Sequence, residues 1–395
     1  MSETPDLHVL HVNSGVDPRQ GGPTTAMLAM IAAQVDVGLR VSVASTFGRD
    51  FKPDAAEQMR RAGAEVHLIG PSTHVLAWHR DIKPTLRRLI AEADIVHVHA
   101  LWEEIQHQAA VISRKLGKPY VFTPHGMLDP WGLSQSRLKK KLYLALRLRR
   151  DLNRAAAIHF TDETERDLAA PLKLTAPAIV ERLIIDLSDF DPPPPRGQFR
   201  AKFASQLGDG DRPILLFMSR IHPKKGLDLL IPAFAQLRAT QDATLVIAGP
   251  DIDGYQAKVE AMVREHNVAD RVLFAGMLYG RDRAAALVDA DLFVLPSYQE
   301  NFGVVVIESL AVGTPVIISD QVNIHRHIGA AGVGDVVAPR ADELSLALEL
   351  ALGDHQLRHD AATRAPEFVR TNYDRTTIAR RWVEHYQRLI ASAPR

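Results

Sequence analysis

The chain has 395 residues, enough for two domains of ordinary size that each hold a hydrophobic core. With 46% hydrophobic and 24% charged residues and a formal charge of zero, it has the composition of a soluble globular protein without a global field that would recruit nucleic acid. Cysteine is absent, which excludes disulfides, thiolate metal sites and cysteine nucleophiles.

Short apolar segments alternate with helical patterns, which predicts parallel sheets wrapped by helices on both faces. The first series of predicted strands comprises residues 7–12, 40–44, 65–69, 94–99, 119–123 and 157–160. The second series comprises residues 213–218, 243–248, 271–274, 291–295 and 315–318. A proline run at 191–195 predicts a stiff linker between the two series. We therefore predict an α/β protein with two doubly wound domains, residues 1–190 and 191–372, followed by an amphipathic helix within 373–395.

The N-terminus is acidic and enters a strand directly, so we do not expect a signal peptide. No apolar run approaches the roughly 20 residues that a membrane span needs. These features predict a cytoplasmic protein.

Two segments of the first domain are candidate ligand sites: the loop after the first strand and the end of the fourth strand. Gly21 and Gly22 lie in the loop after the first strand, but without a G-x-G-x-x-G pattern they are equally well explained as a glycine turn. His97 and His99 alternate along the fourth strand and point to one face, as a metal pair would. Because no third ligand is evident, we favour histidines that line a cleft or are hydrogen-bonded.

Residues 137–154 form a predicted helix with eight basic residues and one acid, Asp151. An apolar side is supplied by Leu138, Leu142, Leu146 and Leu148. Two interpretations stay open. The helix presents a solvated cationic face, or it docks on an anionic membrane surface, where each Lys or Arg contributes on the order of 1 kcal/mol.

In the second domain, the loop after the first strand carries Arg220 and Lys225 just before a helix. A fixed guanidinium, a flexible ammonium and helix amides suit the binding of a diphosphate. Gly249 ends the next strand, where a nucleobase has room to lie against the backbone. Asp289 and Asp291 form a D-x-D pattern, but they border a helix and a strand, and we expect capping or surface roles rather than a metal site.

Residues 297–315 carry Glu300 and, eight positions later, Glu308. A helix is predicted to begin at about Val304 and to end near Gly313, because Pro315 forbids its continuation. The amides at its N-terminus are a ready site for phosphate. If the helix begins near Asn301, both carboxylates can point to one side. This arrangement suits an elongated, polyhydroxylated, phosphorylated ligand such as a nucleotide sugar.

This stretch resembles the Glu-x7-Glu signature of the retaining glycosyltransferases of family 4, which have the GT-B fold of two Rossmann-like domains that face across a cleft. The resemblance implies that Glu300 lies by the donor sugar and Glu308 holds the ribose. It also implies that the amides around Asn301, Phe302, Gly303 and Val304 meet the sugar and the diphosphate. The chain has Asn-Phe-Gly where many members have Gly-Phe-Gly, which leaves the donor sugar open.

Two further motifs extend the resemblance. The segment from Arg220 to Lys225 looks like the family's Arg-x4-Lys-Gly motif, which implies that Arg220 and Lys225 neutralise the departing nucleotide diphosphate. Lys224 is the adjacent alternative. The loop after the fifth strand, TPHGMLDPW, matches the family's His-Gly position. His125 is then expected near the donor sugar, either bonded to a hydroxyl or stabilising the departing charge. Met127, Asp129 and Trp131 are expected to contact the acceptor, and the loop with Gly21 and Gly22 to approach the reacting centre.

The resemblance implies transfer of a sugar from a nucleotide diphosphate sugar to an acceptor hydroxyl with retained configuration and without a metal or other cofactor. We expect a sugar or lipid-linked sugar acceptor, in bacterial polysaccharide or lipid-linked oligosaccharide assembly, and no nucleic acid partner. Residues 181–186 depart from the family's usual Pro-Asn-Gly turn, so domain closure can differ. Two alternatives stay open: a nucleotide-sugar epimerase of similar architecture, and a non-catalytic nucleotide-sugar binding protein.

Overall fold

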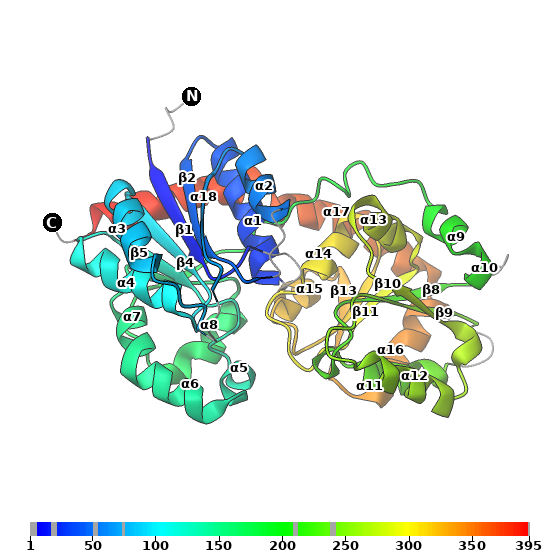
Figure 1. The fold of residues 1–395 in the computed structure, drawn as a ribbon. Coiled ribbons are helices and arrows are strands. Elements are labelled where there is room, and N and C mark those ends of the chain that lie inside the picture. Colours follow the sequence, from blue (N-terminus) through cyan, green and yellow to red (C-terminus); the bar gives the residue numbers. More distant parts are fainter. Residues whose placement is uncertain are drawn as a thin grey trace. The chain divides into compact units, whose positions relative to one another are not determined.

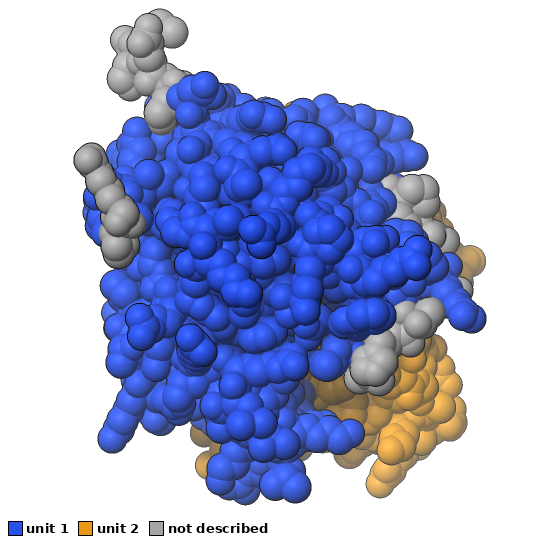
Figure 2. Space-filling view, turned by 60° about the vertical axis from the view of Figure 1, so that its left-hand side comes forward, with its two compact units in different colours: residues 1–185, 373–395 blue, residues 186–372 orange. Residues whose placement is uncertain are grey.

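The computed structural model describes residues 6–16, 22–49, 54–72, 76–207, 212–237 and 242–393. The chain divides into two compact units, and in both of them strands and helices alternate along the sequence (Figure 1). Unit 1 comprises residues 1–185 and 373–395, and unit 2 comprises residues 186–372 (Figure 2). The division falls after Ile185 rather than after residue 190. The proline run at 191–195 therefore belongs to unit 2, where Pro192 accepts a hydrogen bond from Arg281.

Unit 1 contains a seven-stranded sheet in the order β3-β2-β1-β4-β5-β6-β7, and every pair of neighbours is parallel. Its strands are β1 His8–Asn13, β2 Arg40–Thr46, β3 Glu65–Ile69, β4 Ile95–His99, β5 Tyr120–Thr123, β6 Ala157–Phe160 and β7 Ala178–Val180. The last of these, β7, is not predicted from the sequence, because its three residues are too short a run and lie only partly buried at the edge of the sheet.

Helices cover both faces of this sheet. They are α1 Gly22–Asp36, α2 Asp54–Arg61, α3 Ile82–Glu92, α4 Glu104–Lys115, α5 Pro130–Ser134, α6 Arg137–Tyr143, α7 Arg149–Asn153, α8 Glu163–Ala169 and α18 Arg375–Ala391, with a π-helical turn at Leu144–Leu148 and a 3-10 turn at Ala170–Leu172. Because side chains alternate along a strand, Leu10 packs in a core with α3, α4 and α7, whereas Val9 packs in a second core with α1, α2 and α18. The C-terminal helix α18 thus closes one face of the first sheet, through Ile378, Trp382 and Tyr386.

Unit 2 contains a six-stranded parallel sheet in the order β10-β9-β8-β11-β12-β13. Its strands are β8 Ile214–Met218, β9 Thr244–Ala248, β10 Val272–Gly276, β11 Leu292–Leu295, β12 Val316–Ser319 and β13 Gly334–Val337. Central strands such as β8 are buried throughout, as expected for apolar runs in a sheet covered on both faces. The edge strand β13 is not predicted, because its sequence GDVV is short and only half-buried.

The helices of unit 2 are α9 Gln198–Lys202, α10 Ala204–Leu207, α11 Leu227–Ala235, α12 Gln256–Glu265, α13 Gly280–Asp289, α14 Val304–Ala311, α15 His325–Ala331, α16 Ala341–Gly353 and α17 His355–Tyr373. Two 3-10 turns lie at Pro223–Lys225 and Ala269–Arg271. In both sheets the strand order reverses beside the first strand of the unit, β1 or β8, so the loops at the carboxyl ends of these strands and their neighbours are where ligands of such sheets bind. Among the described residues, no helix is long and apolar enough to cross a membrane.

Candidate active site

The loop after β8 places the two predicted cations of unit 2. Lys225 ends the 3-10 turn and is buried, whereas Arg220 is exposed and has no hydrogen bond or ion pair to the described residues. Gly226 follows with φ +72°, and a Cβ there would lie 2.0 Å from the carbonyl oxygen of Pro296. Only glycine fits that approach, so Gly226 allows the loop to lie against the residues that follow β11.

Lys225 forms an ion pair with Glu300, through Nζ and Oε2. Burial by itself would raise the pKa of Glu300, but the charges of Lys225, Lys224 and Arg220 lower it below the usual range. Glu300 is therefore a carboxylate at neutral pH. Its backbone is fixed on the other side, because Glu300 N donates to Gln321 O at 3.0 Å.

Glu308 lies in the second turn of α14 and is 2% exposed. Its Oε1 is 3.0 Å from a guanidinium nitrogen of Arg283, on α13, but its Oε2 is buried without a hydrogen-bond partner among the described residues. Burial raises the pKa of Glu308 to about 7, opposed by Arg283 and reinforced by Asp189 and Asp186. A buried carboxylate oxygen without a partner is costly, and it is satisfied if a ligand hydroxyl donates to it.

The helix α14 begins at Val304, as predicted, so Glu300 precedes it and is not part of the helical face that carries Glu308. Gly303 caps the helix in a left-handed conformation with φ +76°. The Asn301 side chain accepts a hydrogen bond of 3.2 Å from Asn323, and the Phe302 side chain is buried. The predicted phosphate-binding turn thus leads through Gly303 into the first-turn amides of α14.

Gly249 follows β9 with φ +141°, and a Cβ there would lie 1.9 Å from the carbonyl oxygen of Ser219. Its N–H donates to Gly276 O at 2.8 Å. Gly249 thus joins the loops after β8, β9 and β10 into one rim at the carboxyl ends of these strands.

In unit 1, His125 and Gly126 follow β5 and both have positive φ, 52° and 76°. Gly126 N donates to Glu165 Oε1 at 2.5 Å, and Glu165 is buried, which raises the pKa of its carboxyl to about 7. This bond holds the backbone of the loop while the half-buried His125 side chain reaches the end of the sheet.

The residues predicted to contact the acceptor have unequal exposure. Asp129 is buried and caps α5, where it accepts a hydrogen bond from Gly132 N. Met127 packs partly against the core, and Trp131 is 38% exposed. Of the three, Trp131 is the side chain most open to a ligand. Of the loop glycines, Gly21 lies outside the described residues, and Gly22 begins α1.

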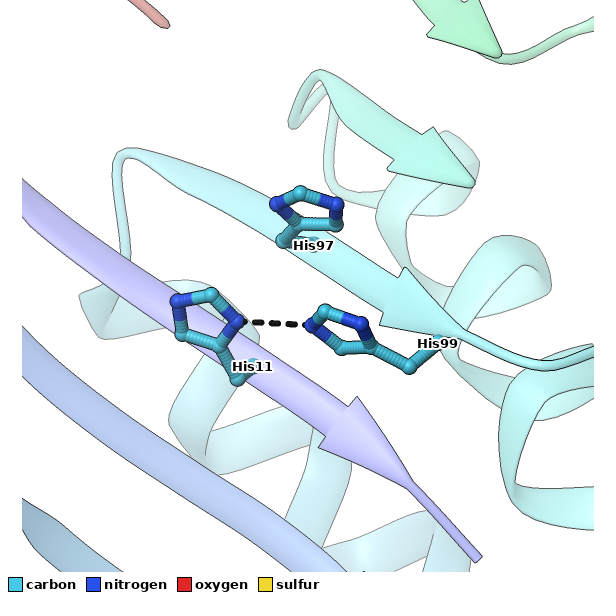
Figure 3. Close-up of side chains that lie close together, drawn as sticks. All are labelled: His11, His97 and His99. Atoms are coloured by element: carbon cyan, nitrogen blue, oxygen red, sulfur yellow. Dashed lines mark hydrogen bonds between the residues drawn. The ribbon is translucent and has the colours of Figure 1, made fainter. Parts of the chain in front are cut away.

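A third histidine, His11, joins His97 and His99 on one face of the first sheet (Figure 3). One nitrogen of each ring lies within 4.8 Å of the others, a group that would suit a metal by distance alone. The rings of His97 and His99 are stacked, however, with an interplanar angle of 11°, so their nitrogen lone pairs do not converge on one point. Both nitrogens of His97 are hydrogen-bonded, to Tyr386 and Thr123, and we interpret the cluster as hydrogen-bonded histidines.

Asp289 and Asp291 have structural roles in unit 2. Asp289 is buried and accepts hydrogen bonds from Gly197 N and Arg200 N, at the start of α9. Asp291 accepts from Ile214 N and from Arg196. The expected capping role is thus present, although Asp289 caps a distant helix from the interior rather than its own helix at the surface.

The predicted basic helix is interrupted by the π-helical turn at Leu144–Leu148, between α6 and α7. Leu148 is buried in the core of unit 1 and does not belong to the outer apolar side, which corrects the prediction. Leu138, Leu142 and Leu146 are 83%, 61% and 72% exposed. The outer face therefore combines exposed leucines with basic residues that are also exposed, including Arg137, Lys139 and Lys141.

Sequence reasoning missed one side chain in each unit, Arg283 in unit 2 and Glu103 in unit 1. Arg283, the partner of Glu308, lies in α13 directly before the buried Ala284, and nothing in its sequence distinguishes it from the neighbouring Arg281. Glu103 follows β4, and burial raises the pKa of its carboxyl, opposed by a hydrogen bond with Ser14. Its Oε2 is buried without a hydrogen-bond partner among the described residues.

The fold matches solved structures over almost the whole chain. The structure of HepE from Anabaena in complex with UDP has a TM-score of 0.78 and 18% identity, and covers 97% of this chain and 100% of that one. WaaG, a glycosyltransferase involved in lipopolysaccharide biosynthesis, has a TM-score of 0.73 and 18% identity, with 96% and 99% of the two chains covered. Two parallel α/β units and these neighbours define a GT-B fold.

The sequence matches two protein families, one in each unit of the structure. Residues 21–181 match the glycosyl transferase 4-like domain, and residues 198–368 match glycosyl transferases group 1. The chain therefore belongs to the group 1, family 4-like glycosyltransferases.

Two curated relatives illustrate the distance within this family. The alpha-D-kanosaminyltransferase of Streptomyces kanamyceticus is 30% identical over 55% of this chain. The match covers 56% of that relative, so the chain spans about half of the relative's length. The GDP-mannose-dependent alpha-(1-6)-phosphatidylinositol monomannoside mannosyltransferase of Mycolicibacterium smegmatis is 25% identical, over 78% of this chain and 79% of the relative. Both are named as transferases, which does not favour the epimerase alternative.

Proposed function

We propose that this protein transfers a glycosyl group from a nucleotide diphosphate sugar to an acceptor hydroxyl, with retention of the anomeric configuration. The observation that carries the proposal is the buried Oε2 of Glu308, in the second turn of α14, which has no hydrogen-bond partner among the described residues. A ribose hydroxyl donating to Glu308 would satisfy this oxygen. None of the described protein groups forms a hydrogen bond with it.

The charges of unit 2 suit the departure of a diphosphate. Arg220 is exposed and unpaired among the described residues, and Lys225 is held by Glu300, so one cation is free and the other is preorganised. Such fixed charges stabilise the negative charge that develops as the bond between the anomeric carbon and the phosphate oxygen breaks. The acceptor oxygen then bonds the same face of that carbon, and its proton passes to the departing diphosphate.

We further propose that the reaction needs no metal, because Arg220, Lys225 and the α14 amides can supply the neutralising charge. Activity that a chelator abolishes and Mg²⁺ or Mn²⁺ restores would refute this part. Support for a nucleotide sugar as donor comes from the relatives. The mycobacterial relative is named for GDP-mannose, and HepE was solved with UDP, so the base differs among similar proteins and has to be measured.

We propose a sugar or lipid-linked sugar as acceptor, in bacterial polysaccharide or lipid-linked oligosaccharide assembly on the cytoplasmic side of the membrane. The exposed leucines of α6 and the π-helical turn, surrounded by cations, favour an anionic membrane surface over a purely solvated face. Flotation with vesicles of phosphatidylglycerol should carry the protein, and Leu142→Ser with Leu146→Ser should weaken this. Leu346→Ser with Leu350→Ser, at exposed positions of α16, is the matched control.

The first test is calorimetric binding of UDP, GDP, ADP and CMP to wild type and Glu308→Gln. We expect one nucleotide to bind selectively and the substitution to weaken it about 10- to 100-fold, the value of a hydrogen bond to a charged group. Glu265→Gln, an exposed glutamate of α12, should have no effect. Equal binding to wild type and Glu308→Gln would refute the ribose site.

The chemistry is tested with the donor that carries the selected base. Product formation with a panel of sugar acceptors, followed by NMR, should give the same anomer as the donor. An inverted product would refute retention. Conversion of the donor into another nucleotide sugar without acceptor would instead indicate an epimerase. A protein that binds the donor but neither transfers its sugar nor slowly hydrolyses it would be a binding protein.

A further inference from the structure

A continuous chain of hydrogen bonds crosses the face of the first sheet that α1 and α18 cover, and it ends at His125. We propose that this chain holds His125 as the tautomer with its proton on Nε2, so that Nδ1 accepts a hydrogen bond from a substrate hydroxyl. The identity of that hydroxyl as a sugar hydroxyl rests on the proposed function. The tautomer itself does not.

The direction of the chain is set at its far end. His159 Nε2 lies 2.7 Å from the backbone carbonyl oxygen of Glu181, and a carbonyl can only accept, so the proton of His159 is on Nε2. His159 Nδ1 is then an acceptor, and the Thr123 hydroxyl donates to it at 2.8 Å. Because its one hydrogen is used, the Thr123 oxygen accepts from His97 Nε2, at 2.6 Å.

The same reasoning continues through helix α18 and helix α1. His97 Nδ1 accepts from the Tyr386 hydroxyl at 2.6 Å. Tyr386 in turn accepts from Gln34 Nε2 at 3.1 Å, which leaves the Gln34 oxygen to accept from His11 Nε2 at 2.8 Å. The Gln34 amide therefore donates to Tyr386 and accepts from His11, which continues the chain in the same donor-to-acceptor direction.

The last two bonds reach the active-site loop. His11 Nδ1 accepts from His99 Nε2 at 2.9 Å, and His99 Nδ1 accepts from His125 Nε2 at 3.2 Å (Figure 3 shows the first of these). Each ring can satisfy both of its neighbours only in this orientation. His125 Nε2 is therefore a donor to His99, and Nδ1 is left as an acceptor without a partner among the described residues.

The chain has one direction only if its rings are neutral, with one proton each. Burial lowers the pKa of His11 to about 4, of His159 to about 4 and of His125 to about 3, and it lowers the pKa of His97 and His99 well below the usual value. The neighbouring histidines add mutual repulsion. At neutral pH the proton count therefore matches the hydrogen-bond pattern.

This tautomer decides between the two roles expected for His125. A neutral ring whose only N–H points to His99 has no positive charge and no proton for a departing phosphate. It can accept from a hydroxyl, and a substrate that lacks this hydroxyl would leave Nδ1 without its partner. Tyr386, Gln34 and His99 are then positioning residues, which act through His125 without touching substrate.

The test measures the tautomer directly, by NMR of the protein labelled with ¹⁵N in its histidine rings. In wild type at pH 7, we expect the His125 resonances to show a protonated Nε2 and an unprotonated Nδ1. A proton on Nδ1, or a mixture of both tautomers, would overturn the proposal. This measurement needs no donor, no acceptor and no activity, so it stands if the proposed function fails.

Tyr386→Phe tests whether the distant chain sets this tautomer. The substitution keeps the buried ring but removes the hydroxyl that orients Gln34, so the amide can turn and reverse His11, His99 and His125. We expect both tautomers of His125 in this variant, and about a tenfold lower turnover. Tyr373→Phe, at another buried tyrosine of unit 1, should leave the His125 resonances unchanged. An unchanged tautomer in folded Tyr386→Phe would overturn the role of the chain.

Discussion

Glu308→Gln should stabilise the protein while it weakens nucleotide binding. In the folded protein, burial raises the pKa of this carboxyl from its ordinary 4.5 to about 7. The folded state therefore keeps a proton that the unfolded chain releases between these values. Wild-type stability falls as the pH rises through this window, whereas the glutamine side chain of the variant has no proton to lose.

The size of the effect follows from the two pKa values. At about 1.4 kcal/mol for each pH unit, ionising Glu308 costs about 3 kcal/mol more in the folded protein than in the unfolded chain. The stability of Glu308→Gln should exceed that of wild type by up to this amount above pH 7, and the difference should vanish near pH 4.5. The glutamine oxygen still accepts from Arg283, so the substitution leaves that guanidinium a partner.

Urea unfolding at pH 5 and pH 8 measures the difference, with circular dichroism as one probe and tryptophan fluorescence as the other. All four tryptophans, at positions 78, 102, 131 and 382, belong to unit 1, so their fluorescence reports unfolding of that unit. The gain should therefore appear in the dichroism of unit 2. A variant no more stable than wild type at pH 8, or a gain that is equal at both pH values, would refute the reasoning.

Three further substitutions test the structural roles around the site. Lys225→Met should lower turnover at least a hundredfold and destabilise unit 2, because it leaves the Glu300 carboxylate without its cation, and adding Glu300→Gln should recover stability but not turnover. Gly226→Ala should lower the melting temperature by far more than Gly254→Ala, since both have positive φ but only the first places a Cβ against backbone; equal melting temperatures would contradict this. Asp289→Ala should cost about 1–2 kcal/mol in unfolding free energy through loss of the cap on α9, and a neutral result would show that the cap is not needed.

Local sequence determined most of the strands, because each central strand is a short apolar run bounded by turn residues. Residues 157–160 and 65–69, for example, are predicted and observed with the same bounds. The edge strands β7 and β13 are not predicted, because a half-buried strand of three or four residues has no distinctive sequence pattern. Their existence depends on a neighbour that offers hydrogen bonds.

The candidate site divides in the same way. Arg220, Lys225, Glu300 and Glu308 are predicted as site residues because their spacing resembles two motifs of the family. That Lys225 neutralises Glu300, whereas Glu308 faces Arg283 and keeps one oxygen unpaired, depends on which loops adjoin across the sheet.

The histidine chain shows most clearly what only tertiary structure decided. Alternation along each strand already placed His97 and His99 on one face, because side-chain direction is a property of the strand itself. The strand register put His11 opposite His97, and the packing of α1 and α18 brought Gln34 and Tyr386 between them. These residues are separated by up to hundreds of positions, and no local rule encodes their contact. The protonation state of His125 is therefore a property of the folded unit.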